Sequence, residues 1–358
     1  MKCRTFEHAL TRTGQRRSSL RRIFGTLLIA LGLAFATTGC GGYIARRIAQ
    51  SPNTYPRWFA PPARVQLGFD PSLLTNFPAH FVDVGPPAAR LRYRVVEPAD
   101  YRLGFSATNW LERGVTRSLF RFSTTVPGVS NAWSAAPRGT VVLLHGYGDG
   151  LFAMTPWALR LAEEGWRCVL VDLRGHGKST GRRIYFGTQE THDLSQLLDQ
   201  LARDGQVAAP VAVLGNSYGG ALALRWKSVE PRVGRVVAIA PYAVLSNAVL
   251  NIRQEYSGWV PAGIVKAGLR KLPGVLQVEP AELDTAVVLA RKPVVALFAY
   301  GAEDRVAPAG EVMRLYREAG PGSELIAVPQ ATHEAVTYYF KELVPPVLKW
   351  LEAGERKQ

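Results

Sequence analysis

Short apolar runs alternate with amphipathic segments along most of the chain from about residue 90. The runs predict strands at Leu91–Val96, Leu119–Thr125, Thr140–Leu144, Cys168–Asp172, Val211–Gly215, Val236–Ala240, Val294–Tyr300 and Glu324–Val328. The segments between them predict helices at Pro156–Glu164, Glu190–Arg203, Gly219–Ser228, Glu311–Glu318 and Tyr338–Leu351. Because apolar strands that alternate with helices are typical of sheets buried on both faces, we expect an α/β fold with a mostly parallel, doubly wound sheet.

Two segments depart from this alternation. Residues 41–89 begin with a stretch rich in Pro, Arg and aromatic residues, and we interpret them as a Pro-rich tether with one short helix near Arg64–Phe69 or Pro71–Thr75. Residues 242–292 are too long for an ordinary crossover, and we interpret them as a helical cap inserted above the sheet. The predicted α/β domain therefore spans residues 90–352.

Residues 1–40 have the order of a signal peptide. They hold seven basic residues and one acid, followed by the uncharged run Ile23–Ala36 and then Thr37-Thr-Gly-Cys40. The Gly-Cys junction resembles a bacterial lipobox, in which Cys40 is the lipidated residue, although Thr37 stands where that motif usually has Leu. We expect a lipid-anchored envelope protein that faces the periplasm, with the outer membrane favoured because Gly41, not Asp, follows the Cys. A secreted protein and an uncleaved anchor are the alternatives.

Composition narrows the protein class. The chain has 358 residues, of which 47% are hydrophobic and 20% charged, so it can bury a large core and is not a disordered chain. The chain has only three cysteines, which makes a disulfide framework unlikely. Cys168 lies in a predicted apolar strand, where a thiol is usually an inert core residue. The net charge of +15 favours contact with anionic surfaces, but no nucleic-acid motif accompanies it. The sequence indicates no cofactor and no metal site.

The segment Gly215-Asn-Ser217-Tyr-Gly219 matches G-x-S-x-G between a predicted strand and a predicted helix, as the nucleophile motif requires. Ser217 is the candidate nucleophile, and it needs a base and an acid that follow it in the chain. His333 is the only histidine after Ser217. Asp304 directly follows a predicted strand, whereas Asp284 falls in the cap. We therefore choose Asp304 as the acid and keep the adjacent Glu303 as its rival.

Two further loops follow predicted strands. His145-Gly-Tyr147-Gly resembles a loop that supplies half of an oxyanion hole, so the backbone N–H groups of Tyr147 and Tyr218 are the candidate donors. Gly177-Lys-Ser179 could suggest a phosphate loop. However, Asp172 replaces the first Gly of that motif, and we reject it.

Taken together, these residues resemble the α/β-hydrolase superfamily over residues 90 to 352. The resemblance is to the monoglyceride-lipase-like and serine aminopeptidase (S33) group, and it is carried by His145–Gly148, Asp172–Ser179, Gly215–Gly219, Asp304 and His333. It implies an α/β-hydrolase fold with a helical cap, a Ser-His-Asp triad and a structural role for the Asp172–Ser179 loop. It does not select a substrate.

We expect a serine hydrolase of carboxylic esters, with lipid-like acyl esters favoured and an acyl-enzyme intermediate. An aminopeptidase or amidase is the alternative. It requires a carboxylate near the cap to hold an amino group, for which Glu255, Glu279 and Glu282 are candidates. A non-catalytic envelope-binding lipoprotein is the third hypothesis. The sequence does not indicate the acyl length or the oligomeric state.

Overall fold

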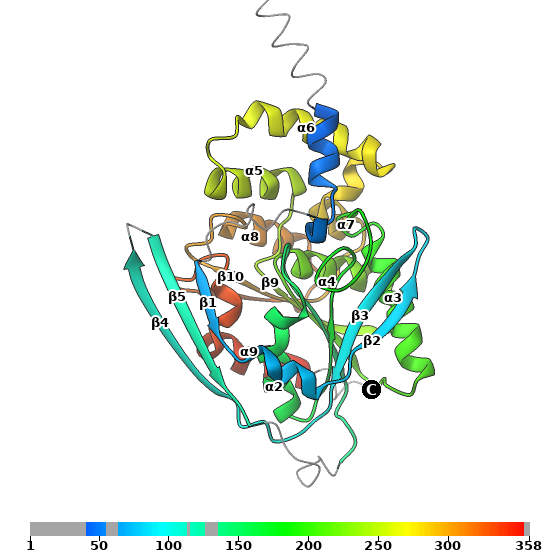
Figure 1. The fold of residues 1–358 in the computed structure, drawn as a ribbon, viewed down its shortest axis with the longest axis vertical. Helices are drawn as coiled ribbons and strands as arrows, with labels where there is room; N and C mark the ends of the chain where they lie inside the picture. Colours follow the sequence, from blue (N-terminus) through cyan, green and yellow to red (C-terminus); the bar gives the residue numbers. More distant parts are fainter. Residues whose placement is uncertain (1–40, 55–63, 113–114, 126–134, 354–358) are drawn as a thin grey trace, which may run out of the picture.

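The computed structural model describes residues 41–54, 64–112, 115–125 and 135–353. An eight-stranded sheet forms the centre of the molecule, with the strand order β11-β10-β9-β8-β6-β7-β3-β2 (Figure 1). Its strands are β2 (His80–Val84), β3 (Ala89–Val96), β6 (Thr140–Leu144), β7 (Arg167–Val171), β8 (Val211–Asn216), β9 (Val233–Ile239), β10 (Leu297–Gly301) and β11 (Glu324–Val328). Strands β6 to β11 pair in parallel, whereas β3 runs antiparallel to both β2 and β7. The predicted mostly parallel sheet is confirmed.

Helices cover both faces of this sheet. The α-helices of the two layers are α2 (Thr155–Glu163) and α9 (Phe340–Glu352) on one face, and α3 (Glu190–Arg203), α4 (Tyr218–Val229), α7 (Thr285–Arg291) and α8 (Ala309–Glu318) on the other. Alternate residues of β6 serve the two cores: Val141 and Leu143 pack on the α2 and α9 side, and Val142 and Leu144 pack on the α4 side. Every residue of β6 is buried, which is why its sequence reads as an unbroken apolar run. Cys168 is also a buried core residue, as predicted.

A second, smaller sheet lies beside the main one, with the order β1-β5-β4. Its strands are β1 (Val65–Gly68), β4 (Gly104–Glu112) and β5 (Val115–Ser123). Phe120 and Phe122 of β5 are buried against Tyr338 and Phe340 at the start of α9, with ring centroids 5.2 to 6.2 Å apart. Strand β4 is exposed along most of its length. It was not predicted, because a strand with little buried surface leaves no apolar pattern in the sequence.

The prediction of a tether over residues 41–89 is wrong for the described parts of that range. Residues 41–48 form a helix, and Ala45 and Ala49 are fully buried. Ser51 is also buried, and its hydroxyl donates to the carbonyl of Gly175 at 2.6 Å. Farther on, β2 joins the edge of the central sheet. Its residues alternate between exposed and buried, and this period of two was overlooked because the strand is only five residues long.

Short 3-10 helices complete the structure. They are η1 (Pro52–Thr54), η3 (Pro71–Asn76), η5 (Leu151–Met154), η6 (Pro280–Leu283) and η7 (Val336–Tyr338). The single helix expected near residue 64 or residue 71 is therefore η3, while residues 65–68 form the strand β1. Asp70 begins η3 by accepting a hydrogen bond from the Ser72 N–H at 2.8 Å.

The predicted insertion contains two long helices, α5 (Leu245–Tyr256) and α6 (Ala262–Leu276), which lie above the sheet with the helix over residues 41–48 beside them (Figure 1). The last part of the insertion differs from the prediction, because α7 packs on α4 and α8 and so belongs to the layer that covers the sheet. We therefore define the cap as residues 245–276 together with residues 41–48. Among the described residues, no helix combines the length and apolar character needed to span a bilayer. Cys40 and the predicted signal peptide lie outside the described residues.

Candidate active site

Ser217 occupies a sharp turn between β8 and α4. Its backbone has φ +54° and ψ −114°, a conformation that L-residues rarely adopt and that costs about 1–3 kcal/mol. The turn is held by the Ser217 N–H, which donates to the carbonyl of Ile239 at 2.7 Å. A Cβ at Gly215 would overlap the carbonyl of Gly219, and a Cβ at Gly219 would overlap that of Leu144. The two glycines of the motif are therefore required by the close approach of neighbouring backbone segments.

The three residues predicted as a triad lie in one hydrogen-bonded chain. The Ser217 Oγ is 2.8 Å from the His333 Nε2, and the His333 Nδ1 is 2.7 Å from the Asp304 Oδ2. The Asp304 side chain is fully buried, and its Oδ1 accepts hydrogen bonds from the N–H groups of Val306 and Ala307 at 2.8 and 2.7 Å. These contacts fix the carboxylate and hold the imidazole with its Nδ1–H toward Asp304 and its Nε2 toward Ser217.

The loops that carry Asp304 and His333 are joined to each other. The Glu303 N–H donates to the carbonyl of Ala331 at 3.0 Å, and the Ala302 N–H donates to that of Val328 at 3.0 Å. Glu303 itself is exposed, and the structure places Asp304, not Glu303, on the imidazole. Asp284 lies elsewhere, where it accepts the Leu245 N–H at the start of the cap.

The loop after β6 approaches Ser217 from the other side. An added Cβ at Gly146 would lie 3.6 Å from the Ser217 Cβ, so the backbone just before Tyr147 borders the nucleophile. Tyr218 is the first residue of α4, where backbone N–H groups have no partner within the helix. The rings of Tyr147 and Tyr218 are perpendicular, with centroids 6.4 Å apart. Both predicted donor residues therefore lie close to Ser217.

His145 and His176 support this loop from beneath. The His145 Nε2 accepts the Leu173 N–H at 3.0 Å, and its Nδ1 lies 2.8 Å from the carbonyl of Gly146. Burial lowers the pKa of His145 to about 4, and burial together with the neighbouring His145 lowers the pKa of His176 to about 3. Both rings are therefore neutral at pH 7. These contacts indicate that His145 shapes the loop and does not act as a base.

Asp172 is the centre of the loop after β7. Its buried carboxylate accepts the N–H groups of Leu151 and Lys178 at 2.7 and 2.8 Å and pairs with Arg92. A Cβ at Gly177 would overlap this carboxylate. In a phosphate loop, backbone N–H groups surround a bound anion. Here, Asp172 takes that position itself, in keeping with the rejected phosphate-loop motif.

A cavity of about 350 Å³ adjoins the Ser-His-Asp chain. Its lining comes from the cap, the segment before β1 and the loops after β10 and β11, and consists of Arg64, Glu255, Ala302, Glu303, Asp304, Arg305, Val306, Thr332, His333 and Glu334. Arg64 and Glu255 form an ion pair across it that links the cap to the rest of the site. Burial raises the pKa of Glu334, and no hydrogen-bond partner for its Oε1 lies among the described residues.

Sequence reasoning identified Glu255 but missed Arg64 and Glu334. Glu334 could have been identified from the sequence, because it directly follows His333. No sequence pattern marked Arg64 as a site residue, because it lies far from the other site residues in the chain. Glu279 and Glu282, the other two carboxylates considered for an amino group, do not line the cavity. Glu282 pairs with Arg291 instead.

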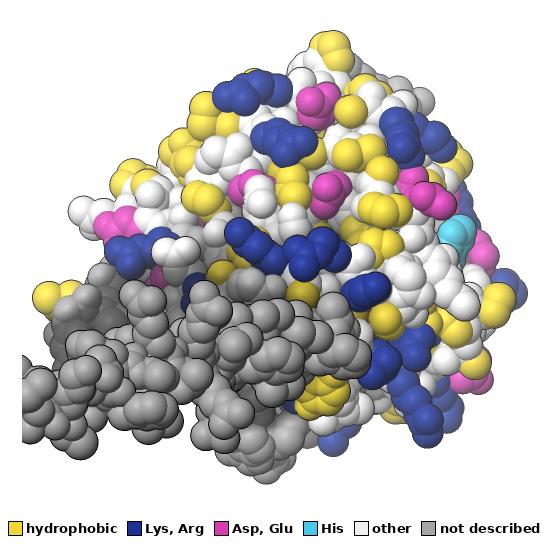
Figure 2. All heavy atoms as spheres, turned by 90° about the horizontal axis from the view of Figure 1, so that it is seen from above, with side chains coloured by type: hydrophobic (Ala, Val, Ile, Leu, Met, Phe, Trp, Pro, Cys, Tyr) yellow, Lys and Arg dark blue, Asp and Glu magenta, His cyan; other side chains and the backbone are white. Residues whose placement is uncertain are grey.

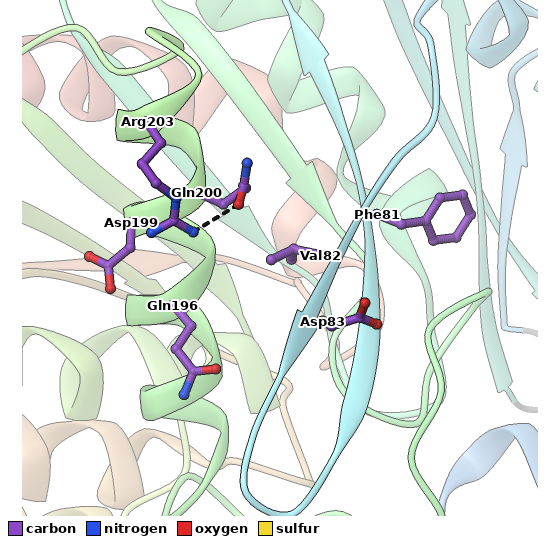
Figure 3. A pocket seen from close by; sticks show the side chains of 7 residues that line it. All are labelled: Phe81, Val82, Asp83, Gln196, Asp199, Gln200 and Arg203. Carbon is purple, nitrogen blue, oxygen red and sulfur yellow. Dashed lines mark hydrogen bonds between the residues drawn. The ribbon is translucent and has the colours of Figure 1, made fainter.

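A second hollow, of about 420 Å³, lies between β2 and α3 at the opposite edge of the sheet from β11 (Figure 3). It is lined by Phe81, Val82, Asp83, Gln196, Asp199, Gln200 and Arg203. Its carboxylates pair with surface arginines, Asp83 with Arg90 and Asp199 with Arg232. With no nucleophile or histidine in its lining, this hollow is the weaker candidate for a catalytic site.

Comparison with known proteins agrees with this geometry. Residues 135–284 match the family described as serine aminopeptidase, S33. The chain is 30% identical over 166 residues to a monoacylglycerol lipase of Mycolicibacterium smegmatis, a match that covers 44% of this chain and 55% of that protein. It is 25% identical over 194 residues to the uncharacterized protein YqkD of Bacillus subtilis, a match that covers 52% of this chain and 63% of that protein. The chain thus spans little more than half the length of these relatives.

Among solved structures, an esterase of Pyrococcus furiosus, Pf2001, superimposes with a TM-score of 0.58 at 20% identity, covering 82% of this chain and 97% of that one. At this level of identity the likeness concerns the fold. The chain therefore has the α/β-hydrolase fold, and its similarity to the serine aminopeptidase S33 family covers the segment that contains Ser217.

Proposed function

We propose that this protein is a serine hydrolase of carboxylic esters. The observation that carries the proposal is the hydrogen-bonded chain from Ser217 through His333 to Asp304, with the serine in a strained turn at the start of α4. A serine hydroxyl is a weak nucleophile, and an adjacent base that an acid holds in place activates it. The relatives named as an esterase and a lipase support ester hydrolysis over other reactions of this fold.

The proposed reaction uses these groups in turn. The Ser217 Oγ attacks the acyl carbon and passes its proton to the His333 Nε2, while the N–H groups of Tyr147 and Tyr218 receive the developing oxyanion. His333 then protonates the departing alcohol, leaving the acyl group on Ser217. Water attacks this acyl-enzyme and gives its proton to His333, which releases the carboxylic acid and restores Ser217. Asp304 stabilises the imidazolium in both halves of the reaction.

We infer that the substrate is an ester of an acyl chain with a polar alcohol. The cavity beside His333 is lined by charged side chains, which suits the alcohol part of such an ester better than an acyl chain. The relative named monoacylglycerol lipase supports this substrate class. The predicted lipidation of Cys40 would place the enzyme in the cell envelope, facing the periplasm and close to lipid substrates.

A fluorophosphonate probe tests the proposed activity directly. The full chain in mild detergent should be labelled, and Ser217→Ala should not be. Nitrophenyl esters of increasing acyl length should be hydrolysed by the wild type, and Ser217→Ala should lower kcat roughly 10⁴- to 10⁶-fold. Absence of labelling on a folded sample would refute the proposal and favour a non-catalytic binding protein.

An aminopeptidase or amidase is the second candidate, and one observation favours it. The unpartnered Glu334 Oε1 beside His333 could accept an ammonium group, whereas Glu255 is already paired with Arg64. Labelling that depends on Ser217, without ester turnover but with cleavage of aminoacyl nitroanilides, would support this candidate over the esterase.

Palmitate-analogue labelling tests the separate proposal for Cys40, since a Cys40→Ala variant should lose the label.

A further inference from the structure

An exposed tryptophan marks the turn between the two cap helices. Trp259 is 80% exposed, the most exposed large apolar side chain among the described residues. Arg253 holds the surrounding turn in place, because its guanidinium donates to the carbonyls of Val260 and Gly258 at 2.5 and 2.6 Å. The Val260 N–H also donates to the carbonyl of Ser257 at 2.8 Å. The tryptophan is thus presented to solvent by an ordered turn, in a protein whose other described tryptophans are buried or no more than about one third exposed.

The outer side of α6 is basic. Lys266 and Arg270, four residues apart, are exposed on the same side of the helix as Gly263 and Gly274, which have open space beside them. Lys271 is also exposed, and α6 contains no acidic residue. The opposite side of α6, with Val265, Leu272 and Leu276, is buried. The cap therefore turns a positive, acid-free helix face toward the surroundings.

The N-terminal residues join the described part of the molecule at this same place. An added Cβ at Gly41 would lie 3.2 Å from the carbonyl of Ala267 in α6, and one at Gly268 would overlap Ile44. Tyr43 and Arg46, in the helix over residues 41–48, are exposed. Because residue 40 is bonded to Gly41, the predicted lipidation site Cys40 is connected to the molecule beside the cap. Seen from above, this end of the molecule shows Lys and Arg side chains among apolar ones, with some Asp and Glu side chains between them (Figure 2).

We propose that the outer face of the cap, defined as Trp259, Lys266, Arg270, Lys271, Tyr43 and Arg46, docks onto a lipid surface that carries anionic headgroups. Tryptophan and tyrosine favour the boundary between headgroups and acyl chains, because each has an apolar ring and a polar edge. Basic side chains close to an anionic surface each strengthen binding roughly fivefold at physiological salt. The lipid proposed on Cys40 would hold the chain at a membrane, and the cap face sets its orientation there. This proposal does not depend on the proposed hydrolase activity.

The test uses the full chain bound to vesicles of phosphatidylcholine with phosphatidylglycerol, in which some lipids carry brominated acyl chains. Bromine quenches only tryptophans that reach the acyl region. Trp157, Trp166 and Trp226 are fully buried and so give a constant background. We expect quenching in the wild type and a clear loss of it in Trp259→Phe. The matched control is Trp110→Phe, which removes an exposed tryptophan of β4 and should leave the quenching unchanged.

A charge variant tests the electrostatic part. Reversing Lys266, Arg270 and Lys271 to Glu should abolish the Trp259-dependent quenching, and vesicles of phosphatidylcholine alone should give much less of it. Equal quenching in wild type and Trp259→Phe would overturn the proposal, because the protein would then be held at the vesicle with its cap away from lipid. A dimer that dissociates in Trp259→Phe, without quenching in the wild type, would also overturn it and assign the face to a second copy of the chain.

The hydrolase activity serves as an independent readout. Turnover of a soluble nitrophenyl acetate should be the same in wild type, Trp259→Phe and the charge variant, because none of these residues borders Ser217. A protein that lacks ester turnover but still shows Trp259-dependent quenching would refute the proposed function and leave the docking surface standing.

Discussion

The carboxyl end of the central sheet and the cap are built in different ways. Ser217, Asp304 and His333 follow β8, β10 and β11, and buried backbone hydrogen bonds hold the loops on which they lie. The cap rests on this end through helix packing and through the ion pair of Glu255 with Arg64, and it exposes a basic face with a tryptophan. The difference indicates a division of labour. In the proposed hydrolase, the sheet would fix the geometry of bond cleavage, and the cap would govern which molecules and surfaces the site meets.

The largest expected effect comes from the acid of the proposed triad. Asp304→Asn should lower kcat about 10⁴-fold, because the amide cannot hold the imidazole in the required tautomer. Steady-state ester kinetics measure the effect, and circular dichroism should show an unchanged fold. Glu303→Gln is the matched control and should retain most of the activity. A large loss in Glu303→Gln and a small one in Asp304→Asn would reverse the assignment.

The serine turn should be intolerant of a single methyl group. Gly219→Ala places a Cβ against the carbonyls of Leu144 and His145, so it should lower the free energy of unfolding by about 3 kcal/mol or more. Urea denaturation measures this change. In the cap, Gly263→Ala has open space around its Cβ and should be neutral or stabilising by up to about 1 kcal/mol. Similar effects at both positions would contradict the contrast between a tight sheet edge and an open cap face.

Stability should fall on mild acidification. Burial lowers the pKa of His145 to about 4 and that of His176, beside it, to about 3, both below the ordinary value of 6.5. At pH values between the lowered pKa of each histidine and its ordinary pKa of 6.5, the unfolded chain binds more protons than the folded one. Stability is therefore complete above about pH 6.5 and decreases as the pH falls, by about 4 kcal/mol for the pair between pH 7 and pH 5.

Urea denaturation at several pH values checks this dependence. His176→Phe keeps an aromatic ring beside Tyr218 but cannot be protonated, so its stability should depend less steeply on pH. His192 is exposed, and His192→Gln should leave the slope unchanged. If His176→Phe keeps the full slope, the pH dependence arises from other groups.

The smallest effect is expected where the cap meets the site. Breaking the ion pair with Arg64→Leu should raise KM about tenfold with little change in kcat, because this pair lines the cavity but does not contact Ser217 or His333. The control is Arg291→Leu, which breaks an exposed pair with Glu282 and should leave both constants unchanged. A drop in kcat with constant KM would place Arg64 in the chemical step and remove the proposed division of labour.

Much of the sheet could be predicted because its strands are buried on both faces. β6, β11 and α3 were predicted with their observed bounds, and the other strands after β6 were placed within a few residues. The exposed β4 and the short edge strand β2 were missed, since neither leaves a continuous apolar run. The three residues of the Ser-His-Asp chain could be chosen because each must follow a parallel strand and the chain offers few His and Asp residues after Ser217.

The sequence by itself determined the serine motif, the order of nucleophile, acid and base, and the alternation of strands and helices, because these depend on local backbone chemistry and on periodicity. Only the tertiary structure decided that residues 41–54 pack onto the molecule, that Arg64 reaches Glu255, and that Trp259 and the basic side of α6 face outward. These features join positions far apart in the chain, 191 residues in the case of Arg64 and Glu255, or depend on which side of a helix is covered. No local sequence pattern predicts which residues come into contact or which side of a helix is buried. The free energy of burial depends on the partner surface, and that surface exists only in the folded chain.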